Sequence, residues 1–244
     1  MRESADICID VQHVFRKFDD KEIIRDMSLQ VSKSEIFGLL GPSGSGKTTL
    51  VKMIAGIDEA TSGQIEVLGT PMPKLAMMNR MGYMSQSDAL YTELTAKENM
   101  EFFGALFGLR SGQLKKRMLE VMELVDLTPH LRRPVGAFSG GMKRRLSLAI
   151  ALLHQPEVLI LDEPTVGIDP VLRKSIWEEL DNQSKQGTTI IVTTHVMDEA
   201  DKCHRLGMIR EGSLIAAGTL EQLKQETGSA TLEEAFLYYG GVRA

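Results

Sequence analysis

Hydrophobic and polar residues alternate in two stretches near the start of the chain. Apolar side chains recur at every second position in residues 7–11 and again in residues 27–31. This period is typical of a strand that buries one face and exposes the other. Asp19-Asp20, between the two stretches, suits a turn. We therefore predict two half-buried antiparallel strands, whose inward positions are Ile7, Ile9, Val11, Met27, Leu29 and Val31.

Three further stretches are apolar without alternation. They are residues 36–40, residues 158–161 and the centre of Thr189–Thr194. Continuous apolar runs of this length are typical of parallel strands that are covered on both faces. Helical patterns separate them, so the chain is predicted to have an α/β core with a doubly wound, mostly parallel sheet.

Between Thr95 and Leu153 the apolar spacing becomes helical. Thr95 and Glu98 have the spacing of a capping box, so one helix is predicted to begin there. A second helix is predicted to end near Pro129, with an apolar stripe of Leu114, Met118, Val121, Met122 and Val125. We expect these helices to form a subdomain inserted into the α/β core.

Two shorter elements are predicted after the last apolar strand. Ile209 to Ala217 has the pattern of a hairpin with Glu211-Gly212 in its turn, and Thr231 with Glu234 forms a second capping box that opens a final helix. The stripe of that helix is interpreted as core packing, with a partner contact as the alternative. Its members are Leu232, Ala235, Phe236 and Tyr239.

The charge balance of the chain argues against a nucleic-acid partner. The chain has 28 Lys and Arg against 33 Asp and Glu, which gives a net charge of −5 over 244 residues without a basic arm. Nucleic-acid binding depends on neutralising phosphates, so we expect no nucleic-acid partner.

The apolar runs are shorter than the roughly 18 residues that span a bilayer, so a partner is expected to supply any membrane-spanning part. Residues 1–6 are too polar for a signal peptide. Cys8 and Cys203 lack the spacing of metal ligands and are expected to be reduced thiols in a cytosolic protein.

Methionine is abundant, and five of the 14 residues are grouped: Met77, Met78, Met81, Met84 and Met100. Filling of gaps in the core is the favoured interpretation. An adaptable groove for the helix of a partner is the alternative, because thioether side chains repack readily.

One glycine-rich stretch carries the clearest chemistry. It reads Gly41-Pro42-Ser43-Gly44-Ser45-Gly46-Lys47-Thr48-Thr49 and matches G-x-x-x-x-G-K-[ST]. The glycines let backbone N–H groups converge on phosphates, and the helix that follows adds its positive dipole end. Lys47 would reach the outer phosphates and the Thr48 hydroxyl would bind Mg²⁺. A strand before the loop and a helix after it make a plain turn the poorer explanation, so we predict a nucleotide site.

Two acids follow the apolar run that ends at Leu161. A core strand would deliver Asp162 to the carboxyl edge of the sheet, where open α/β folds bind ligands. Asp162 would hold Mg²⁺ together with Thr48. Glu163, one residue beyond, would accept a proton from an attacking water. By itself this pattern is a strand that ends in a polar turn, and the phosphate loop upstream changes the interpretation.

Ser139-Gly140-Gly141 opens another long helix. Ser139 is a good N-cap, and the two glycines leave the start of the helix bare enough for an anion to approach. Alone this would be a capped helix without a ligand. Its position shortly before the acid pair favours a role at the nucleotide.

Taken in their order along the chain, these motifs resemble those of the nucleotide-binding subunit of an ATP-binding cassette (ABC) transporter. The resemblance covers essentially the whole chain. The resemblance implies that Asp162 holds the metal and that Glu163 is the catalytic base. Gln86, after a predicted strand at Arg80–Met84, would contact Mg²⁺ and the water. His195 would contact the γ-phosphate.

The resemblance also implies contacts across a dimer of ATPase subunits. Ser139, Gly140 and Gly141 match the signature motif that closes on ATP held by the partner subunit, and Asp169 lies in the loop that crosses the interface. Phe18 falls where the family places an aromatic ring against adenine, with Phe15 as a nearby rival.

The family fold implied is a phosphate-loop NTPase core with an N-terminal antiparallel β subdomain and an inserted α-helical subdomain. We expect residues 1–244 to form one ATPase domain. Its core would comprise residues 1–94 and 155–228, its helical subdomain about residues 95–154, and its C-terminal helix about residues 231–239.

Three positions depart from the common family pattern. Met142-Lys143 follows the two glycines where many relatives have glutamine, Phe18 replaces the commoner tyrosine, and Ser34 stands where glycine is usual. Each departure keeps the charges and donors that hydrolysis needs. The run from Phe138 to Arg145 and the final helix resemble the exporter branch that handles drugs, lipids or polysaccharides.

The resemblance implies that the chain binds and hydrolyses ATP, with ATP and Mg²⁺ as cofactors, and so drives an integral membrane permease. The resemblance to the exporter branch implies that this permease works in export. The subunit would act as a homodimer or heterodimer at the cytoplasmic face of the membrane. A soluble cassette ATPase without a transporter is the first alternative. A phosphotransferase with the same loop is the second, but it has no use for Ser139-Gly140-Gly141 or His195.

Overall fold

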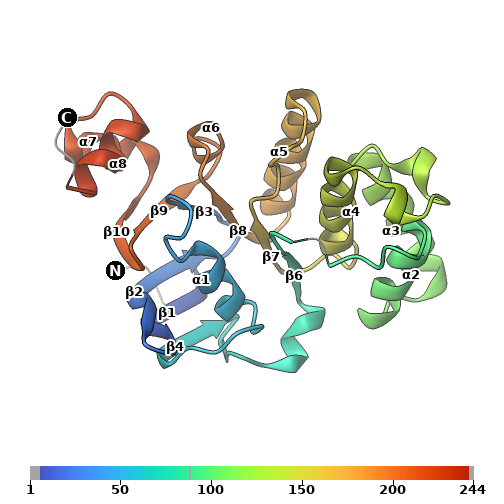
Figure 1. Cartoon of the computed structure of the whole chain (residues 1–244), viewed down its shortest axis with the longest axis horizontal. Helices are drawn as coiled ribbons and strands as arrows, with labels where there is room; N and C mark the ends of the chain where they lie inside the picture. Colours follow the sequence, from blue (N-terminus) through green and yellow to red (C-terminus); the bar gives the residue numbers. More distant parts are fainter. Residues whose placement is uncertain (1–5, 88, 242–244) are drawn as a thin grey trace. The chain divides into compact units, whose positions relative to one another are not determined.

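The computed structural model describes residues 6–87 and 89–241, which divide into two compact units (Figure 1). The first unit contains the described residues of Met1–Leu75 and Thr189–Ala244, and the second contains those of Ala76–Thr188. The expectation that the N-terminus is too polar for a signal peptide rests mostly on residues 1–5, which lie outside the described residues. Residues 242–244 of the expected domain also lie outside them.

The first unit begins with the predicted antiparallel pair. Strands β1 (Ile7–Phe18) and β2 (Lys21–Ser32) pair antiparallel up to Phe18 and Lys21, so the turn at Asp19-Asp20 is confirmed. The short strands β4 (Ser62–Val67) and β5 (Thr70–Pro71) extend this sheet in the order β2-β1-β4-β5.

The predicted alternation holds along β2 but changes phase within β1. His13 has a φ of 48°, and the register shifts between Val11 and Val14. This bulge places one extra residue in the strand, so Val14 returns to the buried face although it is three positions after Val11.

The first unit also contains three parallel strands and a hairpin. Strand β3 (Ile36–Leu40) pairs in parallel with β8 (Thr189–Thr194) and with β9 (Arg205–Arg210). Every residue of β3 and β8 is buried, as their continuous apolar sequences predict. Strand β10 (Ser213–Gly218) pairs antiparallel with β9, which confirms the hairpin and its turn at Glu211-Gly212.

Among its described residues, the first unit has four α-helices. Helix α1 (Lys47–Ile54) follows β3, and the short α6 (Met197–Ala200) follows β8. Helices α7 (Leu220–Thr227) and α8 (Leu232–Tyr239) pack against each other at the C-terminal end (Figure 1). The capping box that opens α8 is confirmed, and two of its four stripe residues are buried, Leu232 and Ala235.

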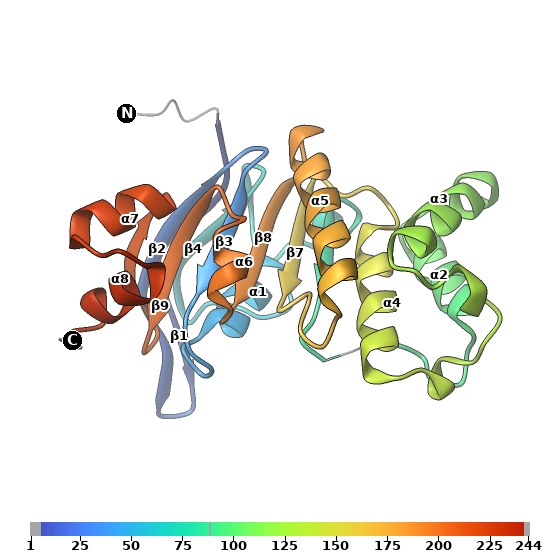
Figure 2. The same ribbon diagram turned by 90° about the horizontal axis from the view of Figure 1, so that it is seen from above.

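The second unit contains a parallel strand pair and the predicted helices. Strand β6 (Met81–Met84) pairs in parallel with β7 (Val158–Asp162). Every residue of β7 is buried. Helices α2 (Ala96–Leu106), α3 (Ser111–Leu124) and α4 (Gly140–Leu152) contact one another (Figure 2). This unit also contains α5 (Pro170–Lys185) and the 3-10 helices at Thr128–His130 and Val135–Ala137. A further 3-10 helix at Leu75–Asn79 begins at the last residue of the first unit's N-terminal segment.

Local sequence signals set the ends of these helices. The capping box of Thr95 and Glu98 opens α2, as predicted. In α3 the stripe residues Met118, Val121 and Met122 are buried, and the chain leaves the helix before Pro129.

The sulfur-containing residues mostly fill the core. Four of the five grouped methionines are buried, namely Met77, Met81, Met84 and Met100, which confirms the core interpretation for them. Met78 is 46% exposed. Cys8 and Cys203 are buried thiols outside any disulfide, and burial raises the pKa of the Cys203 thiol to about 12. Within residues 6–87 and 89–241, a helix with the length and apolar character of a membrane span is not found.

Candidate nucleotide site

The loop between β3 and α1 has the conformation that phosphate binding needs. Gly44 and Gly46 have positive φ values of 79° and 104°, a backbone region that side chains with a Cβ rarely adopt. At Gly41 an added Cβ would lie 2.3 Å from the carbonyl oxygen of Ile209, so only glycine fits there. Because α1 begins directly after this loop, its first N–H groups and positive dipole end face the loop.

Lys47 places its ammonium over the same loop. Its side chain is only 5% exposed, and Nζ donates to the carbonyls of Gly41 at 2.7 Å and Pro42 at 3.0 Å. The lysine ammonium is thus held against the backbone of the loop. A phosphate oxygen is a stronger acceptor than a neutral carbonyl, so these donors suit a bound anion.

Two hydroxyl groups complete this part of the site. Ser45 is 3% exposed, and its Oγ lacks a hydrogen-bond partner among the described residues. A buried hydroxyl in this state fits a loop that is completed by a polar ligand. Thr48, one residue after Lys47, is half-buried in the first turn of α1.

His195 lies at the same sheet edge as the phosphate loop. The two strands are parallel and in register, with Leu40 opposite Thr194, so Gly41 and His195 are the first residues beyond neighbouring strand ends. His195 is exposed. The hydroxyl of the preceding residue, Thr194, donates to Glu199 at 2.7 Å and accepts from the Val196 N–H at 3.0 Å. These two hydrogen bonds hold the segment that contains His195.

Phe18 is the last residue of β1 and is 46% exposed. The Arg16 guanidinium lies 4.2 Å from the centre of its ring and also pairs with Asp58 at 2.6 Å. The ring is therefore held in place on one face, while Phe15 is less exposed. A contact between Phe18 and adenine stays a prediction.

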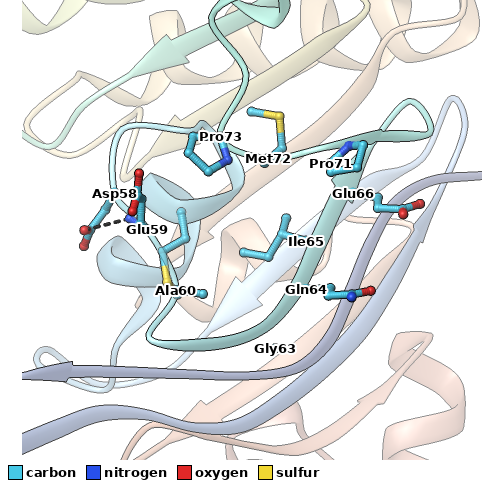
Figure 3. A pocket seen from close by; sticks show the side chains of 11 residues that line it. Asp58, Glu59, Ala60, Gly63, Gln64, Ile65, Glu66, Pro71, Met72 and Pro73 are labelled. Carbon is cyan, nitrogen blue, oxygen red and sulfur yellow. Dashed lines mark hydrogen bonds between the residues drawn. The ribbon is translucent and has the colours of Figure 1, made fainter.

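The first unit also contains a pocket of about 400 Å³, which Figure 3 shows with its lining side chains. Three of its lining side chains are acidic, and Asp58 among them is already paired with Arg16. None of the predicted nucleotide-site residues lines it. Its lining residues are Met53, Asp58, Glu59, Ala60, Gly63, Gln64, Ile65, Glu66, Pro71, Met72 and Pro73.

The second unit brings Gln86 and Glu163 together. Strands β6 and β7 are parallel with Met84 opposite Leu161, so both residues lie two positions beyond paired strand residues. Gln86 Nε2 donates to Glu163 Oε2 at 3.2 Å, although the two residues are 77 positions apart. The amide and the proposed base thus form one polar group at the strand ends.

The backbone of Glu163 is in the left-handed region, with a φ of 53°. For a residue other than glycine this conformation costs about 1–2 kcal/mol. Such strain is typical of positions where surrounding contacts fix a functional side chain.

Sequence reasoning missed Arg144, whose side chain is 7% exposed. Its guanidinium donates to four backbone carbonyls around Gln86 and Glu163. A weak signal was present in the sequence, because Leu148 and Ala151 follow Arg144 at helical spacing and all three are buried in α4. The charged residue therefore begins a buried helix face.

The start of α4 has the expected cap. Ser139 Oγ accepts a hydrogen bond from the Met142 N–H at 3.2 Å, which confirms the N-cap prediction. A Cβ added at Gly140 would meet open space in the described part of the chain. At Gly141 it would lie 3.3 Å from the Gly167 carbonyl oxygen, so the loop before α5 passes beside this helix start.

Asp169 caps the next helix. Its Oδ1 accepts from the N–H groups of Val171 at 3.1 Å and Leu172 at 3.0 Å at the start of α5. This cap is its role within the chain. A contact of Asp169 with a partner subunit stays a prediction.

The residues expected to hold Mg²⁺ offer a hydroxyl, a carboxylate and an amide oxygen, which are ligands that this cation prefers. Asp162 is fully buried at the end of β7, and buried carboxylates are typically paired or bound to cations. The described residues contain no group of three or more His, Cys, Asp or Glu side chains that could hold a metal.

Tyr83 lies on β6 opposite Ile160 of β7, the strand that ends at Asp162. Burial raises the pKa of its phenol, with the negative charge of Asp162 as a smaller contribution in the same direction. The phenol therefore stays neutral at physiological pH.

Comparisons with known proteins show the family of this chain. The sequence profile described as ABC transporter matches residues 24–166. The chain is 41% identical to the linearmycin resistance ATP-binding protein LnrL of Bacillus subtilis, over 92% of this chain and 73% of that protein. It is 42% identical to the Nod factor export ATP-binding protein I of Burkholderia thailandensis, over 92% of this chain and 75% of that protein.

A solved structure of an ATP binding subunit of an ABC transporter superposes with a TM-score of 0.89 at 26% identity, over 96% of this chain and 99% of that one. The predicted fold class is confirmed, including the antiparallel N-terminal sheet and the mostly parallel core. Members of this family bind ATP with Mg²⁺ and hydrolyse it. From its profile, relatives and fold, the chain belongs to the ABC transporter family as an ATP-binding and ATP-hydrolysing subunit.

Proposed function

We propose that this chain hydrolyses ATP as one half of a dimer and so drives a separate membrane permease in export. The observation that carries the proposal is the open start of α4. Ser139 caps the helix, Gly140 faces open space, and the Gly167 loop lies beside Gly141. A bare helix start attracts anions, and a second subunit's ATP is the anion that this family offers it.

The chain's own residues would carry the hydrolysis. Lys47 and the loop of residues 41–49 would hold the phosphates, and His195 would contact the γ-phosphate. Glu163 would take a proton from water as the water oxygen bonds to the γ-phosphorus and the bond to ADP breaks. Gln86 would orient that water. Mg²⁺, held by Thr48 and Asp162 with Gln86, would neutralise charge on the phosphate oxygens.

Dimerisation would complete the site. A phosphate loop leaves one side of the γ-phosphate in water, where electrostatic interactions are weak. The Ser139-Gly140-Gly141 helix start of the partner, with Asp169 in the adjoining loop, would close that side and exclude water. Loss of the γ-phosphate would then release the two subunits.

ATP-binding subunits of ABC transporters dimerise and pair with membrane permeases, and we infer a surface for this contact. Tyr91 and Phe102 are each 45% exposed and Leu106 is 55% exposed. The rings of Tyr91 and Phe102 lie 4.8 Å apart, and Phe103 lies 5.2 Å from Phe102. We call these four residues the aromatic surface. Exposed apolar clusters of this kind are typical of protein contacts.

Several features support the remaining parts of the proposal. The names of the two relatives include resistance and export, which favours the exporter branch. Relatives align along 92% of the chain, which supports treating residues 1–244 as one ATPase domain. Pairing with a permease would hold the subunit peripherally at the cytoplasmic face of the membrane.

Replacing Glu163 with glutamine tests the base and the dimer together. Glu163→Gln keeps the shape of the side chain but removes its basicity, so phosphate release should fall at least about a hundredfold while ATP binding persists. The variant should elute as a dimer with ATP in size-exclusion chromatography. Glu178→Gln, at an exposed acid on α5, is the matched control and should behave as wild type.

Normal hydrolysis by Glu163→Gln would contradict the assignment of the base. Phosphate release by the wild type in the absence of an added acceptor separates hydrolysis from phosphotransfer. A soluble ATPase without a transporter would give the same two results but would capture no permease.

A further inference from the structure

Arg144 lies one helical turn beyond the Ser139-Gly140-Gly141 start of α4, and its guanidinium reaches the strand ends of the same unit. Nη1 donates to the carbonyls of Ser85 at 2.6 Å and Gln86 at 2.9 Å. Nη2 donates to the carbonyl of Glu163 at 2.6 Å and to that of Asp162. One planar group therefore joins the loop after β6 to the loop after β7.

The positions of these carbonyls matter. The carbonyls of Asp162 and Glu163 belong to the two peptide groups on either side of the Glu163 Cα, and each peptide group is planar. Holding both oxygens fixes both backbone dihedrals of Glu163. The left-handed φ of 53° at this residue is the conformation so held.

The same arrangement recurs at Gln86. The carbonyls of Ser85 and Gln86 flank the Gln86 Cα, so Arg144 holds both of its peptide groups as well. The two side chains whose backbones are fixed in this way meet at 3.2 Å, Gln86 Nε2 to Glu163 Oε2. Arg144 itself is almost entirely buried and is turned toward the backbone.

We propose that Arg144 is a positioning residue for ATP hydrolysis. It fixes the backbone of Gln86 and Glu163 and ties both to the helix whose start would contact the partner's ATP. The proposal rests on the roles of Gln86 and Glu163 proposed above. Arginine suits this task because its fork presents several donors in one plane, whereas a lysine ammonium is a single point charge.

Arg144→Gln and Arg144→Lys test this role, with Arg117→Gln as the matched control. Arg117 is also a mostly buried arginine that donates to two backbone carbonyls, those of Leu152 at 3.0 Å and Leu153 at 3.3 Å. It thus holds the other end of α4, away from Gln86 and Glu163. All variants are measured as the full chain, with ATP sites counted by calorimetry.

For both Arg144 variants, kcat per ATP site should fall about tenfold to a hundredfold, the range expected when reacting groups are misplaced by about 1 Å. KM and the calorimetric ATP affinity should stay within about twofold, because the phosphate loop is unchanged. An ATP-bound dimer should accumulate in size-exclusion chromatography, as expected for Glu163→Gln. Arg117→Gln should keep the wild-type kcat per site.

Three results would overturn the proposal: a wild-type kcat in both Arg144 variants, an equal fall in Arg117→Gln, or loss of ATP binding in step with kcat. Failure of both Arg144 variants to fold would assign the residue to stability alone and would overturn it too. Glu163→Gln in the same assay separates the two ideas. If it abolishes turnover while the Arg144 variants are normal, only the positioning role fails.

Discussion

At the scale of single residues, the site depends on groups whose position is fixed before a ligand arrives. Lys47 is buried against the carbonyls of Gly41 and Pro42, so its ammonium is already at the phosphate loop. Little side-chain freedom remains to be lost on binding, which favours affinity. Gly41 is needed for the packing of the loop itself, because a Cβ there would lie 2.3 Å from the carbonyl oxygen of Ile209.

Lys47→Ala should weaken ATP binding by roughly tenfold to a hundredfold. Hydrogen bonds to charged groups contribute about 1.5–3 kcal/mol, and each 1.4 kcal/mol is about a factor of ten in affinity. Isothermal titration calorimetry with ATP and Mg²⁺ measures the change.

Lys52→Ala is the matched control for this experiment. This substitution also removes one lysine charge, but from the last turn of α1, at the opposite end of the helix from the phosphate loop. It should leave ATP affinity nearly unchanged. Equal affinities for the wild type and Lys47→Ala would argue against a phosphate contact by this lysine.

At the scale of elements, α4 combines two features within its first two turns. Its start is capped by Ser139 and open at Gly140, and Arg144 holds the loops after β6 and β7. Helices are stiff over such a short length, so a shift of the helix start would be felt at Gln86 and Glu163. The helix is therefore suited to link the contact with a partner to the hydrolytic groups.

Ser139→Arg should block dimer closure and leave ATP binding by the monomer within about twofold. The long side chain would occupy the helix start where the partner's γ-phosphate is proposed to lie, and the N-cap hydrogen bond would be lost at a cost of about 1 kcal/mol. Size-exclusion chromatography of the Glu163→Gln background with ATP measures dimer formation.

Ser139→Ala separates the two effects in that experiment. It removes the cap but adds no bulk, so the dimer should weaken less than with Ser139→Arg. An undiminished dimer in Ser139→Arg would count against contact between this helix start and the partner's nucleotide.

At the scale of the whole molecule, the residues predicted to form the site are distributed over both units. The first unit contains the phosphate loop, His195 and Phe18, and the second contains Gln86, Glu163 and the Ser139 helix start. Each unit brings its own residues together through parallel strand ends, in the way that open α/β sheets form ligand sites. The aromatic surface belongs to the second unit.

Affinity purification from detergent-solubilised membranes of the source cells should recover an integral membrane permease with the tagged wild-type chain. Replacing Phe102 by serine in the aromatic surface should reduce recovery at least about tenfold, because buried aromatic anchors dominate interface energies. ATP hydrolysis by the isolated variant should remain within about twofold of the wild type. Mass spectrometry of the captured proteins gives the measurement.

Tyr238→Ser is the control for surface polarity, since Tyr238 is 63% exposed on α8 in the other unit. It should leave recovery of the permease unchanged. Recovery without any membrane protein would favour the soluble ATPase, and equal recovery with Phe102→Ser would exclude the aromatic surface as the contact.

The sequence by itself determined the features that depend on neighbouring residues. Period-two and continuous apolar runs predicted β2, β3, β7 and β8, because burial on one face or on both imposes these patterns. The capping boxes at Thr95 and Thr231 predicted helix starts, since the hydrogen bonds involved span three residues. The phosphate loop was recognisable for the same reason, as its ligands are contiguous.

Only the tertiary structure decided the contacts between distant segments. The bulge at His13 changed the phase of β1, and the pairing of Gln86 with Glu163 required the register of β6 on β7. The burial of Arg144 on four carbonyls was also invisible in the sequence. Backbone carbonyls carry no sequence signature, and their positions depend on how whole strands pack, so local patterns could not reveal the residue that joins them.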